Sequence, residues 1–476
     1  MKKNLTILLF VFCGFFYANA QSNLKRCSSE TPSAEWDEWF NAKVEEFKLA
    51  QQNGRTKANT TYVIPVVFHV IYGTQNIGTY PNLSKAQVTS QIQILNDDFQ
   101  GKGYNSNQYA TMGTGGKLPF YNYAVANNLP APNNNGVAIG SLSIEFKPVW
   151  VKPNGDTLTE LGIDRISYSS KSWSNPASFT SATQFKNYMD NTIKPASIWD
   201  PTKYLNVWVT DCDQNVSLLG YSTFPSGTTL TGLGSGTGTS NTDGTWIWAQ
   251  ACGNVGTLTA GYNKGRTLTH ELGHFLGLRH TWGDSNCGTD YCNDVPPSQT
   301  ANYNAWPITY PFNTSTCTAT GLYKSNATDG EMFMNFMDYC EDAAMWMFTN
   351  DQVTRMNTAL TQSTNRKNLT ASSLLVCKPD VGASAQTIAK QYLKTVTNVY
   401  PNPTNGLINI STDFASNTNL KVEVRNVVGQ TVFTSIAKSV SSNVLQYDLS
   451  SLNKGIYFIT LTSENGSAIT QKIIFE

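Results

Sequence analysis

With 476 residues, the chain is long enough for two or three domains that each bury a sizeable core. Its 33 Lys and Arg residues balance 33 Asp and Glu, and charged residues make up 14% of the sequence, against about 25% in an average domain. A zero net charge without a basic run argues against a nucleic-acid-binding protein, while 40% hydrophobic and 12% aromatic residues exclude disorder over most of the length. Only four histidines are present, so their positions carry information.

The N-terminus predicts an export signal. Two lysines precede an apolar run over residues 5–17, and Ala18-Asn19-Ala20 forms a small-residue cleavage site, so residues 1–20 read as a signal peptide cut after Ala20. The run is shorter than the roughly 20 residues that span a bilayer, which disfavours a transmembrane anchor. Cys13 does not follow a small residue, which disfavours a lipoprotein anchor. We expect a secreted protein, extracellular or at the cell surface, that passes through the periplasm and has no membrane span.

A charged pro-segment, residues 21–54, follows, with a helix expected over 34–51. Residues 63–72 form a continuous apolar, β-branched run that predicts a buried strand, in which His69 is expected to be a structural residue rather than a ligand. Ser84 is a plausible N-cap for an amphipathic helix that runs to about Gln100. Three more strands are expected over 142–151, 204–209 and 246–249, and a second helix over 182–192. Residues 225–244 are rich in Gly, Ser and Thr, which predicts a long surface loop. The strand–helix–strand order predicts a mixed sheet flanked by helices.

Three of the four histidines lie within eleven residues, at His270, His274 and His280. On a helix, His270 and His274 share one face and can bind one ion, while Glu271 is close enough to reach a metal-bound water. Gly277 can adopt a left-handed conformation that ends the helix and lets His280 complete a tripod. Three neutral imidazoles that leave a fourth position open are typical of a catalytic zinc site.

The C-terminal residues 396–476 alternate Val, Ile, Tyr and Phe positions with hairpin turns, which predicts a small antiparallel β-sandwich, joined by a linker over 379–395. From the pattern alone, the module could be adhesive, carbohydrate-binding or a spacer. Its segments 400–404, 449–457 and 472–476 resemble the sorting domain of the type IX (Por) secretion system. This resemblance implies the type IX machinery as a partner and removal of the domain after export.

The residues from His270 to His280 match H-E-x-x-H-x-x-G-x-x-H, the metzincin signature. Residues 334–339 match the Met-turn of this clan. The pappalysin family is resembled in four segments: 265–274, 280–284, 287–296 and 335–339. Astacins share the zinc motif but have no similar sequence at 282–296 and 335–342. The resemblance implies an α+β protein. Its metzincin domain, residues 55–378, would have a mixed, mostly parallel twisted sheet with helices above it and an irregular, disulfide-stapled lower subdomain.

The resemblance also implies a secreted zinc-dependent endopeptidase that acts on protein or peptide substrates. His270, His274 and His280 would bind the zinc, and Glu271 would be the general base that takes a proton from the zinc-bound water. Tyr339 would stabilise the oxyanion, unless it is only a packed turn tyrosine. The competing reading is a surface adhesin with a non-catalytic zinc fold, against which Glu271 and Tyr339 argue.

Further roles come from the same resemblance. Met337 would shape the floor of the site, and Asp342 would bind Arg or Lys just after the cut, although the adjacent Glu341 could point inward instead. Asp290 and Asp294 would hold structural calcium. The segment differs from the family's sequence pattern at Asn293 and Val295.

Eight cysteines remain after the signal peptide, and export predicts that most are paired. Arg26-Cys27 resembles the family's cysteine switch, in which Cys27 binds zinc in a latent zymogen, with a disulfide as the alternative. The basic preference after the cut points to self-cleavage between Gly54 and Arg55. Cys287, Cys292, Cys317 and Cys340 are expected to form two bridges around the predicted calcium-binding segment. A third bridge is expected between Cys212 and Cys252.

Overall fold

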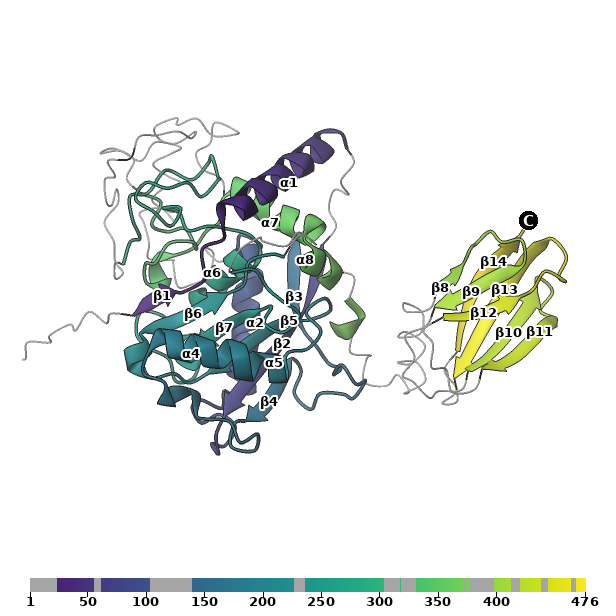
Figure 1. Ribbon diagram of the computed structural model, residues 1–476, viewed down its shortest axis with the longest axis horizontal. Coiled ribbons are helices and arrows are strands. Elements are labelled where there is room, and N and C mark those ends of the chain that lie inside the picture. Colours follow the sequence, from purple (N-terminus) through teal and green to yellow (C-terminus); the bar gives the residue numbers. More distant parts are fainter. Residues whose placement is uncertain are drawn as a thin grey trace, which may run out of the picture.

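The computed structural model describes residues 24–54, 61–102, 139–226, 236–303, 317, 331–370, 373–376, 398–411, 420–437, 444–463 and 468–476. The predicted signal peptide, Arg55 of the predicted processing site and the predicted linker over 379–395 lie outside these residues. Two bodies of secondary structure are present, one before residue 377 and one after residue 397 (Figure 1).

A seven-stranded sheet forms the centre of the first body, in the order β1-β6-β7-β5-β2-β3, with β4 also paired to β2. Its strands are β1 (Lys25–Cys27), β2 (Tyr62–Tyr72), β3 (Ile144–Pro148), β4 (Ile163–Ser167), β5 (Leu205–Thr210), β6 (Leu218–Ser222) and β7 (Thr245–Trp248). Every pairing is parallel except that of β6 with β7. The prediction of a mixed, mostly parallel sheet is therefore confirmed.

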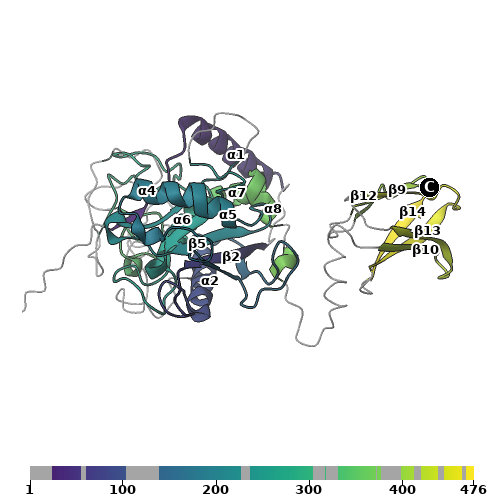
Figure 2. The ribbon, with the colours of Figure 1, turned by 60° about the horizontal axis from the view of Figure 1, so that its bottom comes forward.

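Helices cover both faces of this sheet (Figure 2). The helices are α1 (Ala34–Gln52), α2 (Lys85–Phe99), α4 (Ala182–Tyr188), α5 (Lys194–Ser197), α6 (Arg266–Phe275), α7 (Asn350–Gln362) and α8 (Thr364–Leu369), with a π-helical turn at Met189–Ile193. Strand side chains alternate between two hydrophobic clusters: Val207 and Val209 lie in the one that includes α2 and α6 residues, whereas Trp208 lies in the one that includes α4 residues. The sheet thus holds α6, which carries the histidines, firmly on one face.

The predicted elements of the first body agree with these bounds to within a few residues. Ser84 caps α2 by accepting a hydrogen bond from the Gln87 amide at 3.2 Å. The buried His69 bonds Asp164 at 3.0 Å and Asn206 at 2.9 Å, which confirms its structural role. Three strands were not predicted, namely β1, β4 and β6.

The C-terminal body is an antiparallel β-sandwich. One sheet has the order β11-β10-β13-β14 and the other β12-β9-β8. The strands are β8 (Asn398–Tyr400), β9 (Leu407–Ser411), β10 (Leu420–Asn426), β11 (Thr431–Ala437), β12 (Val444–Asp448), β13 (Gly455–Ser463) and β14 (Ala468–Phe475). Ile410, Val422 and Ile459 belong to a core cluster formed by residues of this module alone, as expected for a unit with its own fold.

Candidate metal centre and substrate cleft

Helix α6 and the turn after it bring the three clustered histidines together. His270 and His274 are four residues apart on α6, whose Leu268 and Leu272 anchor the opposite side in the core. Gly277 has a φ of +89°, so the chain reverses after the helix, as the sequence predicts. The ring centroids of His280 lie 5.2 Å from His270 and 4.5 Å from His274.

Hydrogen bonds fix the orientation of all three rings. Nδ1 of His270 bonds the Phe336 carbonyl at 2.7 Å, Nδ1 of His274 bonds the Leu278 carbonyl at 2.8 Å, and Nδ1 of His280 bonds the Asp284 carboxylate. Because these oxygens only accept, each Nδ1 carries the proton and each Nε2 presents a lone pair.

The three lone pairs converge on one point. Nε2 of His274 lies 3.0 Å from Nε2 of His280, and the buried Nε2 of His270 has no hydrogen-bond partner. Two lone pairs at this distance repel each other unless a cation lies between them. The donor set, with its oriented outer nitrogens, therefore fits a zinc ion.

The predicted pro-segment adds a sulfur to this cluster. Cys27 Sγ and one nitrogen from each of the three histidines lie within 4.8 Å of one another, and all four residues are buried. Cys27 Sγ is also 3.4 Å from Glu271 Oε2, and Ser29 Oγ donates to the same oxygen at 2.9 Å. The Tyr339 hydroxyl donates to the Cys27 carbonyl at 3.2 Å. Cys27, Glu271 and Tyr339 thus surround one point beside the histidines.

Burial sets the protonation states here. Desolvation, followed by the two neighbouring histidines, holds the pKa of His270 well below its usual value, and desolvation followed by His280 lowers the pKa of His274 to about 3. Both rings are therefore neutral and able to bind a metal. Burial raises the pKa of Glu271 to about 8, in the range suited to a group that takes up and releases a proton near neutrality. Burial and then Glu271 raise the pKa of the Cys27 thiol.

Two glycines allow the close packing around Glu271 and the histidines. A Cβ atom at Gly220 would lie 2.8 Å from Cγ of Glu271, so the glycine lets β6 approach the carboxylate. A Cβ atom at Gly273 would collide with Sδ of Met337, which is fully buried beneath α6. Met337 therefore lies directly against the histidine helix, where the Met-turn prediction puts it.

Asp342 lies in a buried polar cluster that includes Arg26 of strand β1. Arg26 donates to Oδ1 of Asp342 at 2.9 Å, and both side chains are fully buried. The other oxygen of Asp342 accepts from the amides of Lys264 at 2.8 Å and Arg266 at 3.2 Å. Asp342, rather than the adjacent Glu341, therefore binds the arginine.

Asp290 and Asp294 are both buried, and Oδ2 of Asp290 and Oδ1 of Asp294 have no hydrogen-bond partner. Burial raises the pKa of Asp290 above its usual value, and burial followed by Asp351 raises that of Asp294 to about 6. Buried carboxylate oxygens without partners are costly unless a cation is bound, so the two residues fit a calcium ion.

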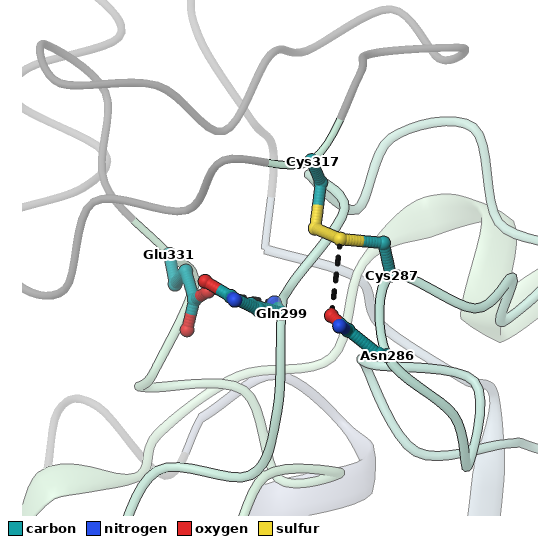
Figure 3. The surroundings of a disulfide bond; sticks show 5 residues. All are labelled: Asn286, Cys287, Gln299, Cys317 and Glu331. Carbon is teal, nitrogen blue, oxygen red and sulfur yellow. Dashed lines mark hydrogen bonds between the residues drawn. A yellow bond between two sulfur atoms is a disulfide. The ribbon is translucent and has the colours of Figure 1, made fainter.

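Cys287 and Cys317 form a disulfide, which joins the loop after the histidines to a later segment (Figure 3). The expectation of two bridges among the four cysteines of this region is wrong for Cys292, which is a buried thiol. Cys212 and Cys252 are also thiols. They belong to the clusters on opposite faces of the sheet, which explains why they do not pair.

The sequence analysis missed the role of α1 and its partners. Asp37 of α1 forms an ion pair with Arg279, at 2.5 Å from Nη2, and Arg279 also binds Asp284, the residue that orients His280. Trp36 and Phe40 of α1 are fully buried. The family resemblance of segment 280–284 could have drawn attention to Asp284. Nothing in the sequence links Arg279 to Asp37, which lies 242 residues earlier.

Sequence comparison relates this geometry to known proteins. The profile described as pregnancy-associated plasma protein-A matches residues 187–361, which include all three clustered histidines. A solved structure of a promirolysin mutant from Tannerella forsythia is 32% identical, and the match covers 71% of this chain and 94% of that one, with a TM-score of 0.50. The chain belongs to the pregnancy-associated plasma protein-A family of peptidases. It is thus a metalloendopeptidase with the predicted metzincin fold, and the family implies zinc as its metal.

Two further proteins are similar to this chain. Mature mirolysin from Tannerella forsythia, solved in complex with a cleaved peptide, is 33% identical over 68% of this chain and all of its own, with a TM-score of 0.49. An extracellular metalloprotease of Verticillium alfalfae is 24% identical over 333 residues, which are 70% of this chain and 87% of that protein. Because this chain belongs to a family of peptidases, the alternative hypothesis of an adhesin with a non-catalytic zinc fold is wrong.

The C-terminal β-sandwich matches a separate profile, the secretion system C-terminal sorting domain, over residues 398–476. This match confirms the prediction of a secreted protein that uses the Por (type IX) machinery. Among the described residues, no helix is both long and apolar enough to cross a membrane.

Proposed function

We propose that His270, His274 and His280 hold a catalytic zinc ion, and that the protein is a secreted endopeptidase kept latent by its own pro-segment. The observation that carries this proposal is the convergence of three buried imidazole nitrogens and the Cys27 sulfur within 4.8 Å, next to Glu271. Three nitrogens and one sulfur would together hold zinc in a latent form, and removal of Cys27 would leave the three histidines to hold it with one position open for catalysis.

When bound, zinc acts as a Lewis acid that polarises the scissile carbonyl. Glu271 accepts a proton from the attacking water and delivers it to the leaving amine, a task suited to its raised pKa. The hydroxyl of Tyr339 now donates to a carbonyl oxygen of the pro-segment, at Cys27. In the active form, the same hydroxyl would donate to the oxyanion of the substrate.

The pro-segment supports a preference for Arg or Lys after the cut. Strand β1 lies along β6 with Cys27 opposite Gly220, so an extended substrate could pair with the same edge once β1 leaves. Arg26, next to Cys27, fills the position beside Asp342 with a guanidinium group. A substrate arginine or lysine would make the same charge-assisted hydrogen bond.

Calcium at Asp290 and Asp294 completes the proposal. It would neutralise two buried carboxylates and hold the segment after the histidines in place. The pro-segment, residues 21–54, would be removed by a cut between Gly54 and Arg55, before the catalytic domain of residues 55–378. The sorting domain, residues 396–476, would be removed after export.

The test is replacement of Glu271 by Gln in the processed protein. We expect a folded protein that retains one zinc ion and does not digest casein, while the wild type digests it and loses this activity to a chelator. Retained proteolysis by the E271Q variant would sink the assignment of Glu271. A wild type without zinc, or without activity, would overturn the proposed function as a whole.

A further inference from the structure

A cavity of about 200 Å³ lies beside β6, and Asp342 is not among its lining residues. Its lining combines charged and polar residues of several elements: Lys186, Asp190, Lys194, Tyr221, Thr223 and the pro-segment residue Glu30. None of these residues belongs to the histidine cluster or to the calcium segment. Figure 1 shows α4, which carries Lys186, on the same side of the first body as β6 and β1.

Two of the charges in this cavity neutralise each other. Lys194 is fully buried, and its ammonium group lies 2.7 Å from Oδ1 of Asp190 and 4.1 Å from the ring centroid of Tyr221. The Tyr221 hydroxyl donates to the same Asp190 oxygen at 2.9 Å. The charge of Asp190 is thus balanced by Lys194. Without Glu30, the remaining charge in the cavity is the positive charge of Lys186.

Lys186 lies 5.1 Å from the ring centroid of Tyr221, and the two oxygen atoms that it contacts both belong to the pro-segment. Its ammonium group donates to the Ser28 carbonyl at 2.9 Å and lies 3.6 Å from Oε1 of Glu30. The Lys186 side chain is 17% exposed, so water screens the pairing only partly. Removal of the pro-segment would take away both acceptors and leave the Lys186 ammonium group as an unpaired cation beside β6.

The order of contacts along the pro-segment places the cavity relative to the metal centre. Arg26 contacts Asp342, Cys27 contacts the histidines, and Glu30 contacts Lys186. Between them, the Ser28 amide donates to the Gly220 carbonyl at 3.1 Å. The pro-segment therefore runs along β6 with a base on one side of the metal centre and an acid on the other.

We propose that this cavity is a substrate subsite in which Lys186 binds an aspartate or glutamate side chain, on the side of the cut opposite to the basic residue. This inference rests on the proposed peptidase function and extends it to the substrate class, which is a segment with an acid before the cut and a base after it. The carboxylate of the substrate takes the place of Glu30 and makes a charge-assisted hydrogen bond to the ammonium group.

The test uses the processed enzyme and fluorogenic peptides with Arg after the cut and Glu or Gln at each of the three positions before it. At one of these positions, we expect kcat/KM to be about tenfold higher for Glu, as a difference of about 1.4 kcal/mol in binding the transition state would give. Lys186→Met should bring the ratio of kcat/KM for the Glu and Gln peptides close to one. Lys186→Arg should retain the advantage of the Glu peptide, and Lys203→Met, a matched change at an exposed lysine, should have no effect.

The outcomes separate this inference from the function on which it rests. Equal cleavage of Glu and Gln peptides at all three positions by the wild type overturns the subsite and leaves the peptidase intact. An equal loss for both peptides in Lys186→Met also overturns it, because Lys186 would then have only a structural role. Failure of the wild type to cleave any peptide instead overturns the proposed function.

Discussion

At the scale of single residues, the behaviour of the metal centre depends on the acceptors that hold each imidazole. Two of the histidines bond backbone carbonyls, but His280 bonds the Asp284 carboxylate, which Arg279 also binds at 3.0 Å. Carboxylate partners of this kind raise the basicity of a metal-binding histidine and keep the ring in one orientation. Asp284 is thus the residue outside the donor set on which zinc affinity should depend most directly.

Replacement of Asp284 by Asn should therefore weaken zinc binding by about 10- to 100-fold, because the amide lacks the charge that supports His280. Competition with a chelator of known affinity measures this effect on the processed protein. Asp156→Asn, at an exposed turn, is the matched control and should leave zinc affinity unchanged. An affinity equal to that of the wild type in Asp284→Asn would show that the carboxylate contributes nothing.

The calcium segment should show a distinct pH dependence. Without calcium, burial raises the pKa of Asp294 to about 6, so the folded state holds its proton to higher pH than the unfolded state, and stability falls as pH rises from about 4 to 6. Calcium binds the ionised form, so its stabilising effect should grow through the same window and be complete above pH 6.

Thermal unfolding with added calcium or with a calcium-selective chelator, at fixed zinc, measures this effect between pH 4.5 and 7.5. Asp294→Asn should remove most of the calcium-dependent rise in Tm, while Asp156→Asn should keep it. A calcium effect of the same size at pH 4.5 and pH 7.5 contradicts the linkage to Asp294.

At the scale of elements, α1 of the predicted pro-segment packs on the rest of the first body through buried aromatic rings. Trp36 stacks on Phe40 at 4.7 Å and meets Phe224 edge-on at 5.4 Å, and its indole nitrogen donates to the Pro225 carbonyl at 2.9 Å. Phe40 also fills the space beside Gly277, where a Cβ atom would lie 2.6 Å from its ring. Burial of these rings keeps α1, and with it β1, against the catalytic domain.

Trp36→Ala should loosen this docking by about 3–5 kcal/mol, the usual loss for a buried large aromatic, which is more than 100-fold in the docking equilibrium. We expect the uncut protein to remain folded but to show measurable peptide cleavage and faster proteolysis within α1. Trp39→Ala, on the same helix but only partly buried, should cause a much smaller change. Equal latency of the two variants would show that α1 does not contribute to inhibition.

The same elements show what sequence reasoning could and could not reach. Long apolar runs and capping signals identify β2 and α2, because their patterns are local. The strands β1 and β6 have three and five residues without clear alternation, so only their pairing defines them. The histidine cluster is likewise local, whereas the contact of Arg26 with Asp342 joins residues 316 positions apart and depends on the whole fold.

At the scale of the whole molecule, the sorting domain has a core of its own, so its removal should affect export rather than the fold of the enzyme. Deletion of residues 398–476 should therefore leave a folded, zinc-binding zymogen that stays within the cell. The fraction of protein in the culture medium, measured by immunoblot, tests this. The full-length E271Q variant controls for effects of activity and should be exported normally. Normal export of the truncated protein contradicts the role of the domain.

The parallel pairing of β1 with β6 has a consequence for the enzyme after activation. In the latent form, β6 has a neighbour on each side, with β1 on one and β7 on the other. Loss of the pro-segment gives the sheet a new open edge with unpaired backbone groups, and such edges readily pair with other chains. If the predicted pro-segment is removed, the edge of β6 becomes free to pair with other chains. We therefore expect the processed enzyme to aggregate, or to cleave other copies of itself, more readily than the uncut protein.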